Sequence, residues 1–141
     1  MRIIHVFVLL LLGVAAWAAT PIKGLLERID KGGSRKFIIE QTNAPTDFFE
    51  LDQKDDKVVV RGNNYVCIAT GLNWYLKYYA GIHLSWNSMQ AELPEVLPAV
   101  KQKERHETTM KYRYNFNYCT FSYTMAFWDW ERWEKEIDWM A

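Results

Sequence analysis

Residues 58–86 read VVVRGNNYVCIATGLNWYLKYYAGIHLSW, and this stretch decides the fold class. The β-branched run at its start is typical of a strand, and the Gly-Asn-Asn after it is typical of a turn. Residues 65–79 predict a helix that Gly81 ends, because apolar side chains recur at helical spacing: Val66, Ala69, Leu72, Leu76 and Tyr79. Residues 82–86 predict a second strand. The succession of strand, helix and strand predicts an α/β domain, a sheet with packed helices.

The stretch before residue 58 predicts a short helix and another strand. Residues 21–30 (PIKGLLERID) form one apolar helical stripe, and the Gly pair at 32–33 ends it. Residues 36–41 (KFIIEQ) are apolar and β-branched, as a strand would be. The polar connection that follows leaves room for a third short strand around residues 48–51.

Beyond residue 92 the pattern changes twice. Pro94, Pro98 and the charged run 101–106 predict a linker or a long surface connection. Residues 111–120 (KYRYNFNYCT) interleave aromatic and polar side chains, which predicts a strand. A helix follows, because apolar residues recur at helical spacing: Trp130, Trp133, Ile137 and Met140. Asp129 can cap this helix, and Glu131 and Lys135 have the i,i+4 spacing of an ion pair. This pattern reaches Ala141 without a stop signal, so we expect the natural protein to continue.

The first residues predict a signal peptide at 1–18. Arg2 precedes an apolar run at residues 6–14, and the small-residue site Ala-Trp-Ala ends at Ala18. The run is too short to span a membrane as a helix, which takes about 20 apolar residues. No Cys follows the site, which disfavours a lipoprotein. We therefore expect export to the periplasm or the cell exterior, with no transmembrane segment.

The charge balance argues against nucleic acid as a partner, and the low cysteine count means that an apolar core must stabilise the domain. The chain has 17 basic and 17 acidic residues. Loss of Arg2 with the signal peptide makes the balance slightly acidic, so no basic field invites nucleic acid. Cys67 and Cys119 are the only cysteines, and we expect buried thiols rather than a disulfide framework. The sequence does not indicate an oligomeric state.

Several chemistries lack their motifs. His83 and His106 stand alone, and no HExxH or CxxC occurs, so we expect no metal. The sequence also has no GxSxG for a nucleophile and no Gly-rich phosphate loop, so we expect no cofactor.

Two features suit carbohydrate chemistry but have ordinary alternatives. Glycoside hydrolysis takes two carboxyls across a sugar. The acids near the end of the chain lie on one predicted helix, where we expect a solvated face: Glu131, Glu134, Glu136 and Asp138. The aromatic residues between 112 and 130 could stack on sugar rings, although such stripes are more often core.

Residues 111–141 read KYRYNFNYCTFSYTMAFWDWERWEKEIDWMA. This run resembles the alpha-N-acetylglucosaminidases of glycoside hydrolase family 89, which carry YRY-x-x-N-x-C-T-x-S-Y followed by WDW-x-RWE-x-EIDWMA. The upstream stretch GLNWYLKYYAGIHLSW is similar, more loosely, to that family's N-terminal domain, and LPEVLPAV resembles the connection after it. A shared pattern of this length is highly specific.

The resemblance implies a small α/β domain at residues 19–107, followed at 108–141 by the first strand and helix of a truncated (β/α)₈ barrel. It also implies a retaining glycosidase that removes terminal alpha-linked N-acetylglucosamine from glycans with two glutamates. Both glutamates would lie beyond this chain, so we expect the 141 residues alone to be inactive. Of the residues present, Asn117 and Cys119 match positions that border the sugar pocket. The alternative is a stand-alone carbohydrate-binding or interaction module without catalysis.

Overall fold

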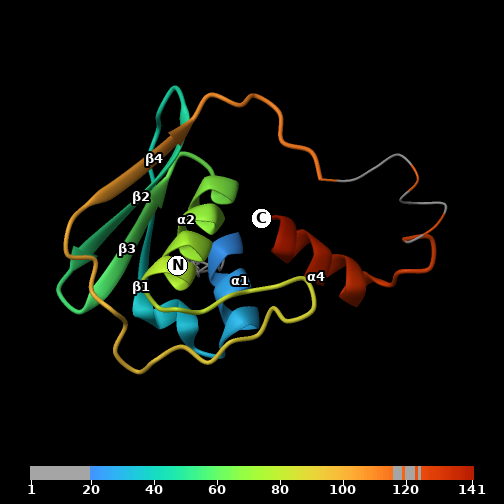
Figure 1. Ribbon diagram of the computed structural model, residues 1–141, viewed down its shortest axis with the longest axis horizontal. Coiled ribbons are helices and arrows are strands. Elements are labelled where there is room, and N and C mark those ends of the chain that lie inside the picture. Colours follow the sequence, from blue (N-terminus) through green and yellow to red (C-terminus); the bar gives the residue numbers. More distant parts are fainter. Residues whose placement is uncertain (1–19, 116–118, 120–122, 124) are drawn as a thin grey trace, which may run out of the picture.

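The structure is a computed structural model that describes residues 20–115, 119, 123 and 125–141. A four-stranded sheet carries helices on one face (Figure 1), which confirms the predicted α/β class. Its strand order is β1-β3-β2-β4. The strands are β1 (Phe37–Gln41), β2 (Asp47–Lys54), β3 (Lys57–Gly62) and β4 (Glu104–Thr108). The helices are α1 (Pro21–Ile29), a 3₁₀ turn η1 (Gly33–Lys36), α2 (Tyr65–Tyr78) and α4 (Trp130–Met140).

Strand β3 is the centre of the sheet. It runs parallel to β1 and antiparallel to β2, and β4 adds to the far edge of β2 in antiparallel pairing. Val58, Val59 and Val60 have no exposed surface. Because successive side chains point to opposite faces of a sheet, both faces of β3 must be covered.

Helices α1 and α2 cover the inner face. The four apolar residues predicted on α1 are all buried against the sheet and α2: Ile22, Leu25, Leu26 and Ile29. At the start of α2, the Asn64 side chain accepts a hydrogen bond from the Cys67 amide at 2.9 Å. Near its end, the buried Tyr75 donates its hydroxyl to the Pro98 carbonyl at 2.6 Å, and burial raises the pKa of Tyr75 to about 12. The loop that contains Pro98 is thereby tied to the core.

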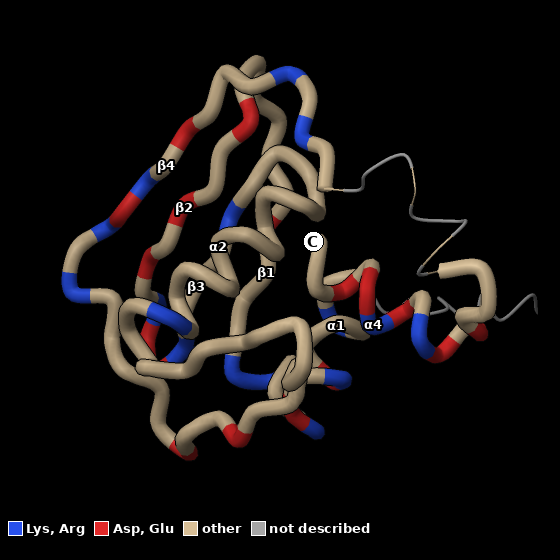
Figure 2. The backbone as a smooth tube through the Cα atoms, turned by 45° about the vertical axis from the view of Figure 1, so that its right-hand side comes forward, with Lys and Arg blue, Asp and Glu red and all other residues tan. Residues whose placement is uncertain are grey.

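Long charged side chains cover the outer face. Arg61 of β3 donates to Glu50 at 3.0 Å, to Asp52 at 2.8 Å and to Glu40. These bonds raise the pKa of Arg61, and the bond to Asp52 has the largest effect. They also link β3 to its neighbours β1 and β2. Arg105 of β4 lies over the Phe48 ring at 3.7 Å. Figure 2 marks the positions of charged residues along β2 and β4 in blue and red.

Two predictions about the sheet are wrong. Residues 82–86 form no strand and contain only one isolated bridge, Ser85 to Ser88. The edge position next to β2 goes instead to β4, which lies in the run predicted as a linker. An edge strand is held by main-chain hydrogen bonds, so a charged sequence with no apolar alternation can form one. Strand β2 also runs for eight residues, longer than the short strand expected near residues 48–51.

The end of the chain contains the predicted helix, whereas the described part of the predicted strand at 111–120 is not extended into a strand. Asp129 accepts from the Arg132 amide at 2.9 Å and caps α4, and the Glu131–Lys135 ion pair forms at 3.1 Å. Residues 111–115 and 119 form no strand, and 116–118 and 120 lie outside the described residues. A barrel strand needs hydrogen-bonded neighbours on both sides.

Residues 1–18, the predicted signal peptide, lie outside the described residues. Among the residues that are described, no helix is long and apolar enough to cross a membrane.

Helix α2 approaches the sheet most closely at Gly71, and this contact yields the first prediction. A Cβ there would lie 3.0 Å from Val60 Cγ1 and 3.1 Å from Phe49 Cβ, both in the core. Although alanine favours helices by about 1 kcal/mol, overpacking costs about 1–3 kcal/mol, so Gly71→Ala should destabilise the fold by about 1 kcal/mol. Urea unfolding measures this change. The control is Asn73→Ala on the exposed side of α2, and a Gly71→Ala protein more stable than this control would contradict the packing argument.

Candidate functional site

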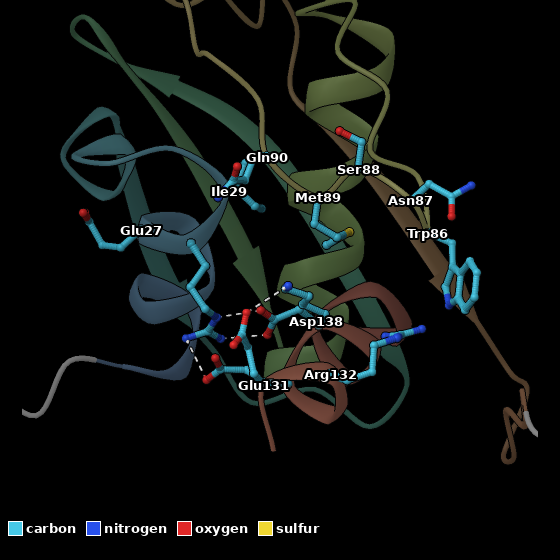
Figure 3. A pocket seen from close by; sticks show the side chains of 13 residues that line it. Glu27, Ile29, Trp86, Asn87, Ser88, Met89, Gln90, Glu131, Arg132 and Asp138 are labelled. Carbon is cyan, nitrogen blue, oxygen red and sulfur yellow. Dashed lines mark hydrogen bonds and ion pairs between the residues drawn. The ribbon is translucent and has the colours of Figure 1, made fainter. Parts of the chain in front are cut away.

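A groove of about 620 Å³ lies between the N-terminal part of the chain and α4 (Figure 3). Its walls come from the last turn of α1, from residues 86–90 and from one side of α4. Charged side chains dominate these walls: Glu27, Arg28, Glu131, Arg132, Glu134, Lys135 and Asp138. We call this the seam groove. It contains three of the four acids considered above as carboxyl candidates.

The first wall contact is a bidentate ion pair. Arg28 Nε and Nη2 of α1 donate to the two carboxylate oxygens of Asp138 at 2.6 and 2.7 Å. The Asp138 side chain is only 12% exposed, and these bonds raise the pKa of Arg28. Glu134, one turn earlier on α4, lies 3.7 Å from the same guanidinium. Such two-point pairing fixes orientation as well as distance.

The second contact is a buried carboxylate. Glu136 is 4% exposed, and its Oε2 accepts from Trp86 Nε1 at 2.6 Å and from Arg132 at 2.8 Å. The Arg132 guanidinium lies over two indole rings, 4.8 Å from the centre of Trp86 and 3.9 Å from that of Trp128. The hydrogen bonds from Trp86 and Arg132 thus offset the cost of burying the Glu136 carboxylate.

The expectation that all four acids form a solvated face is therefore wrong. Glu131 is exposed, with 77% of its side chain accessible, but Glu136 is buried and Asp138 nearly so. On the opposite face Trp130 is 70% exposed and Ile137 is 46% exposed. The helical pattern gives the two faces correctly, but it cannot say which of them meets a partner.

These carboxylates do not form a glycosidase pair. A retaining enzyme takes two carboxyls that face one sugar, and one of them must carry a proton. Each acid of α4 instead lies against a cation: Glu131 against Lys135, Glu134 and Asp138 against Arg28, and Glu136 against Arg132. The ion pairs of the seam groove join α4 to the N-terminal part of the chain, so these acids have a structural role in the contact between the two.

A second polar cluster surrounds Glu104 on the helix side of β4. Its carboxylate accepts from Tyr79 at 2.6 Å and from Trp74 Nε1 at 3.1 Å, and it lies 2.6 Å from His106 Nε2. His106 also stacks on Phe49, with ring centres 4.8 Å apart. The hydrogen bond from Tyr79 is the main reason why the pKa of Glu104 is lowered, and the same bond raises the pKa of Tyr79 to about 12.

The view of His106 as a lone histidine is thus wrong. Glu104 and His106 are two residues apart, and this spacing places both on one face of a strand. That signal is present in the sequence, but it becomes readable only when residues 104–108 are recognised as a strand.

The two residues predicted to border a sugar pocket are not brought together by any described contact. Asn117 lies outside the described residues. Cys119 is half-buried in a turn, where its carbonyl accepts from the Tyr123 amide at 3.1 Å. Cys67 is buried in α2, and burial raises the pKa of its thiol. No disulfide joins the two cysteines.

No group of three or more His, Cys, Asp or Glu side chains in the described part of the chain is arranged to hold a metal ion.

Two family models match the chain, one before and one within the segment that ends in α4. The model described as the Alpha-N-acetylglucosaminidase (NAGLU) N-terminal domain matches residues 20–99, more than half of the chain. The chain belongs to the alpha-N-acetylglucosaminidase family. The model described as the tim-barrel domain of the same family matches residues 113–141. The resemblance to glycoside hydrolase family 89 is therefore confirmed.

Individual relatives agree with this assignment. The alpha-N-acetylglucosaminidase of Homo sapiens is 48% identical over 85 residues, which cover 60% of this chain. Two structures of a family 89 glycoside hydrolase from Clostridium perfringens, in complex with PUGNAc and with 2-acetamido-1,2-dideoxynojirmycin, are 38% identical. Each has a TM-score of 0.75 over 84% of this chain. The chain spans only 11% of the human relative and 14% of the clostridial one.

The Glu104 cluster predicts two pH effects. Because the folded-state pKa of Glu104 is lowered, its contribution to stability is present above the unfolded pKa and is lost as pH falls through the folded pKa. The pKa of Tyr79 is raised, so its contribution to stability is present below pH about 10, the unfolded-state pKa, and is lost as the pH rises toward about 12.

Tyr79→Phe should therefore lower the free energy of unfolding at neutral pH by about 1 kcal/mol and weaken both pH-dependent losses. Urea unfolding between pH 3 and pH 11 measures them. Tyr78→Phe, at the exposed neighbouring position, is the control and should leave both losses unchanged. Equal pH profiles for Tyr79→Phe and the parent chain would disprove the role of the hydroxyl.

Proposed function

We propose that this chain is the N-terminal portion of an exported glycoside hydrolase that removes terminal alpha-linked N-acetylglucosamine from glycans. The observation that carries the proposal is the succession of the two family models in one chain, at residues 20–99 and 113–141. We assign residues 1–18 to a signal peptide, 19–107 to the α/β domain and 108–141 to the start of the catalytic barrel.

A retaining mechanism with two glutamates is part of the proposal. One glutamate would attack the anomeric carbon and the other would protonate the leaving oxygen, and the two carboxyl groups would lie about 5–5.5 Å apart. A variant of the clostridial relative with two glutamates changed to glutamine is described in complex with its substrate, GlcNAc-alpha-1,4-galactose, which supports this mechanism and substrate class. The ion-paired acids of α4 fit neither role, so we place both glutamates outside this chain.

For substrate binding we propose Asn117 and Cys119. Active sites of such barrels lie at the C-terminal ends of the strands, and both residues lie near the end of the expected strand at 111–120. In the intact protein they would line the pocket for the N-acetylglucosamine ring.

A carbohydrate-binding module without catalysis is the second candidate. Its support is a group of exposed aromatic side chains between β4 and α4, including Tyr123 at 83% and Phe127 at 99% exposure. Aromatic faces stack on sugars, and Tyr112 and Tyr114 belong to the same exposed group. Trp130, the first residue of α4, is exposed as well.

One assay separates the two candidates. The 141-residue chain should release no 4-nitrophenol from 4-nitrophenyl alpha-N-acetylglucosaminide, whereas the protein from the complete reading frame should release it. Calorimetric titration of the 141-residue chain with GlcNAc-alpha-1,4-galactose should show no binding. Binding without hydrolysis by both proteins would favour the module, and hydrolysis by the 141-residue chain would contradict the placement of both glutamates outside it.

The export proposal has its own test. Signal peptidase cleaves directly after the last residue of a small-x-small pattern, here Ala16-Trp17-Ala18, so the mature protein should begin at Ala19. N-terminal sequencing of the protein recovered from the periplasm or medium measures this directly. Replacing Ala18 with Arg should leave a longer, uncleaved form, whereas an intact Met1 on the exported parent protein would contradict the signal peptide.

A further inference from the structure

We propose that the polar face of α4 is a docking surface for residues 20–107, and that this docking is what makes α4 helical. By the polar face we mean the side of α4 whose side chains Arg132, Glu134, Glu136 and Asp138 make or support contacts with residues 20–107. The proposal concerns an interaction within this chain and does not depend on the proposed enzymatic activity.

The polar face is anchored at both of its edges. Glu136 and Asp138 are two residues apart, so about 200° of helix rotation separates their side chains. Asp138 meets Arg28 of α1 on one side of the seam groove, and Glu136 meets Trp86 on the other. The exposed pair Glu131–Lys135 lines the groove between them. Two anchors on opposite flanks fix the rotation of α4 as well as its position.

The helix has little stability of its own. It is 11 residues long, and isolated helices shorter than about 12–15 residues are marginal in water. The Glu131–Lys135 pair adds little to its stability, because both side chains are exposed and solvent screens the pair. On the apolar face Trp130 and Ile137 are exposed, whereas at the C-terminal end of the helix Ala141 packs against the apolar core. Contacts of the polar face therefore add the order that this terminal packing does not supply.

A third contact, between Arg113 and Asp47, lies at the other end of the segment that runs from residue 113 to α4. Arg113 donates to Asp47 at the start of β2, and Asp47 also accepts from Asn63 at 3.0 Å and from Asn64 at 2.9 Å. The charges are reversed at the two ends: the N-terminal part provides Asp47 at one and Arg28 at the other. A segment docked in the wrong direction would place like charges together, so this arrangement selects one orientation.

Hydrogen exchange in the complete 141-residue chain tests the proposal. Arg28→Glu and Asp138→Arg should each speed amide exchange in α4 about tenfold, since either change replaces attraction by repulsion at a partly exposed pair. The double variant Arg28→Glu/Asp138→Arg should bring exchange back toward the parent rate, because the opposite charges face each other again. Asp138→Asn, which keeps the shape of the side chain, should give a smaller increase.

Two controls keep the result interpretable. Amides of α2 should exchange at the parent rate in every variant, which shows that the domain remains folded. Glu131→Gln removes a charge from the same helix at an exposed position and should leave α4 unchanged within about twofold. The proposal is overturned if the single reversals leave α4 protected, or if the double variant exchanges as fast as the single ones.

Discussion

Burial of β3 on both faces is the constraint on which the rest of the structure depends. One face of this strand meets α1 and α2, and Val58 and Val60 join the apolar core there. No helix among the described residues covers the other face, yet Val59 has no exposed surface. The Arg61 guanidinium and the carboxylates around it cover that face with side chains that are long, paired and still partly hydrated. An apolar strand can therefore occupy the middle of a four-stranded sheet with helices on one side.

The same use of paired charges recurs where α4 meets the rest of the chain. A bidentate Arg28–Asp138 pair and a buried Glu136 join α4 to the domain, in addition to the apolar packing of Ala141 against the core. Ion pairs of this kind contribute less to stability than apolar burial, but they tolerate only a narrow range of geometries. The apolar face of α4 remains available on the opposite side, where Trp130 and Ile137 are exposed. A helix with these two faces is suited to a position between two layers.

The family assignment and the geometry agree about where the chemistry lies. The chain contains a family N-terminal domain and the beginning of a barrel sequence, and its acids of α4 are engaged in ion pairs. A barrel places its reacting groups at the ends of several strands, so residues 113–141 alone cannot assemble them. Within this portion, α4 is joined to the N-terminal domain by the contacts that line the seam groove.

The sequence by itself determined the elements whose signals are local. Helical periodicity placed α1, α2 and α4, and β-branched runs placed β1 and β3. Asp129 caps α4 as its position before the helix predicted. The motif at residues 111–141 was sufficient to indicate the family. Tertiary structure alone decided that residues 104–108 form the edge strand and that residues 82–86 do not, because strand pairing depends on which backbone lies alongside. It also decided that Glu136 is buried and Trp130 exposed, since an amphipathic pattern defines two faces but does not name the partner of either.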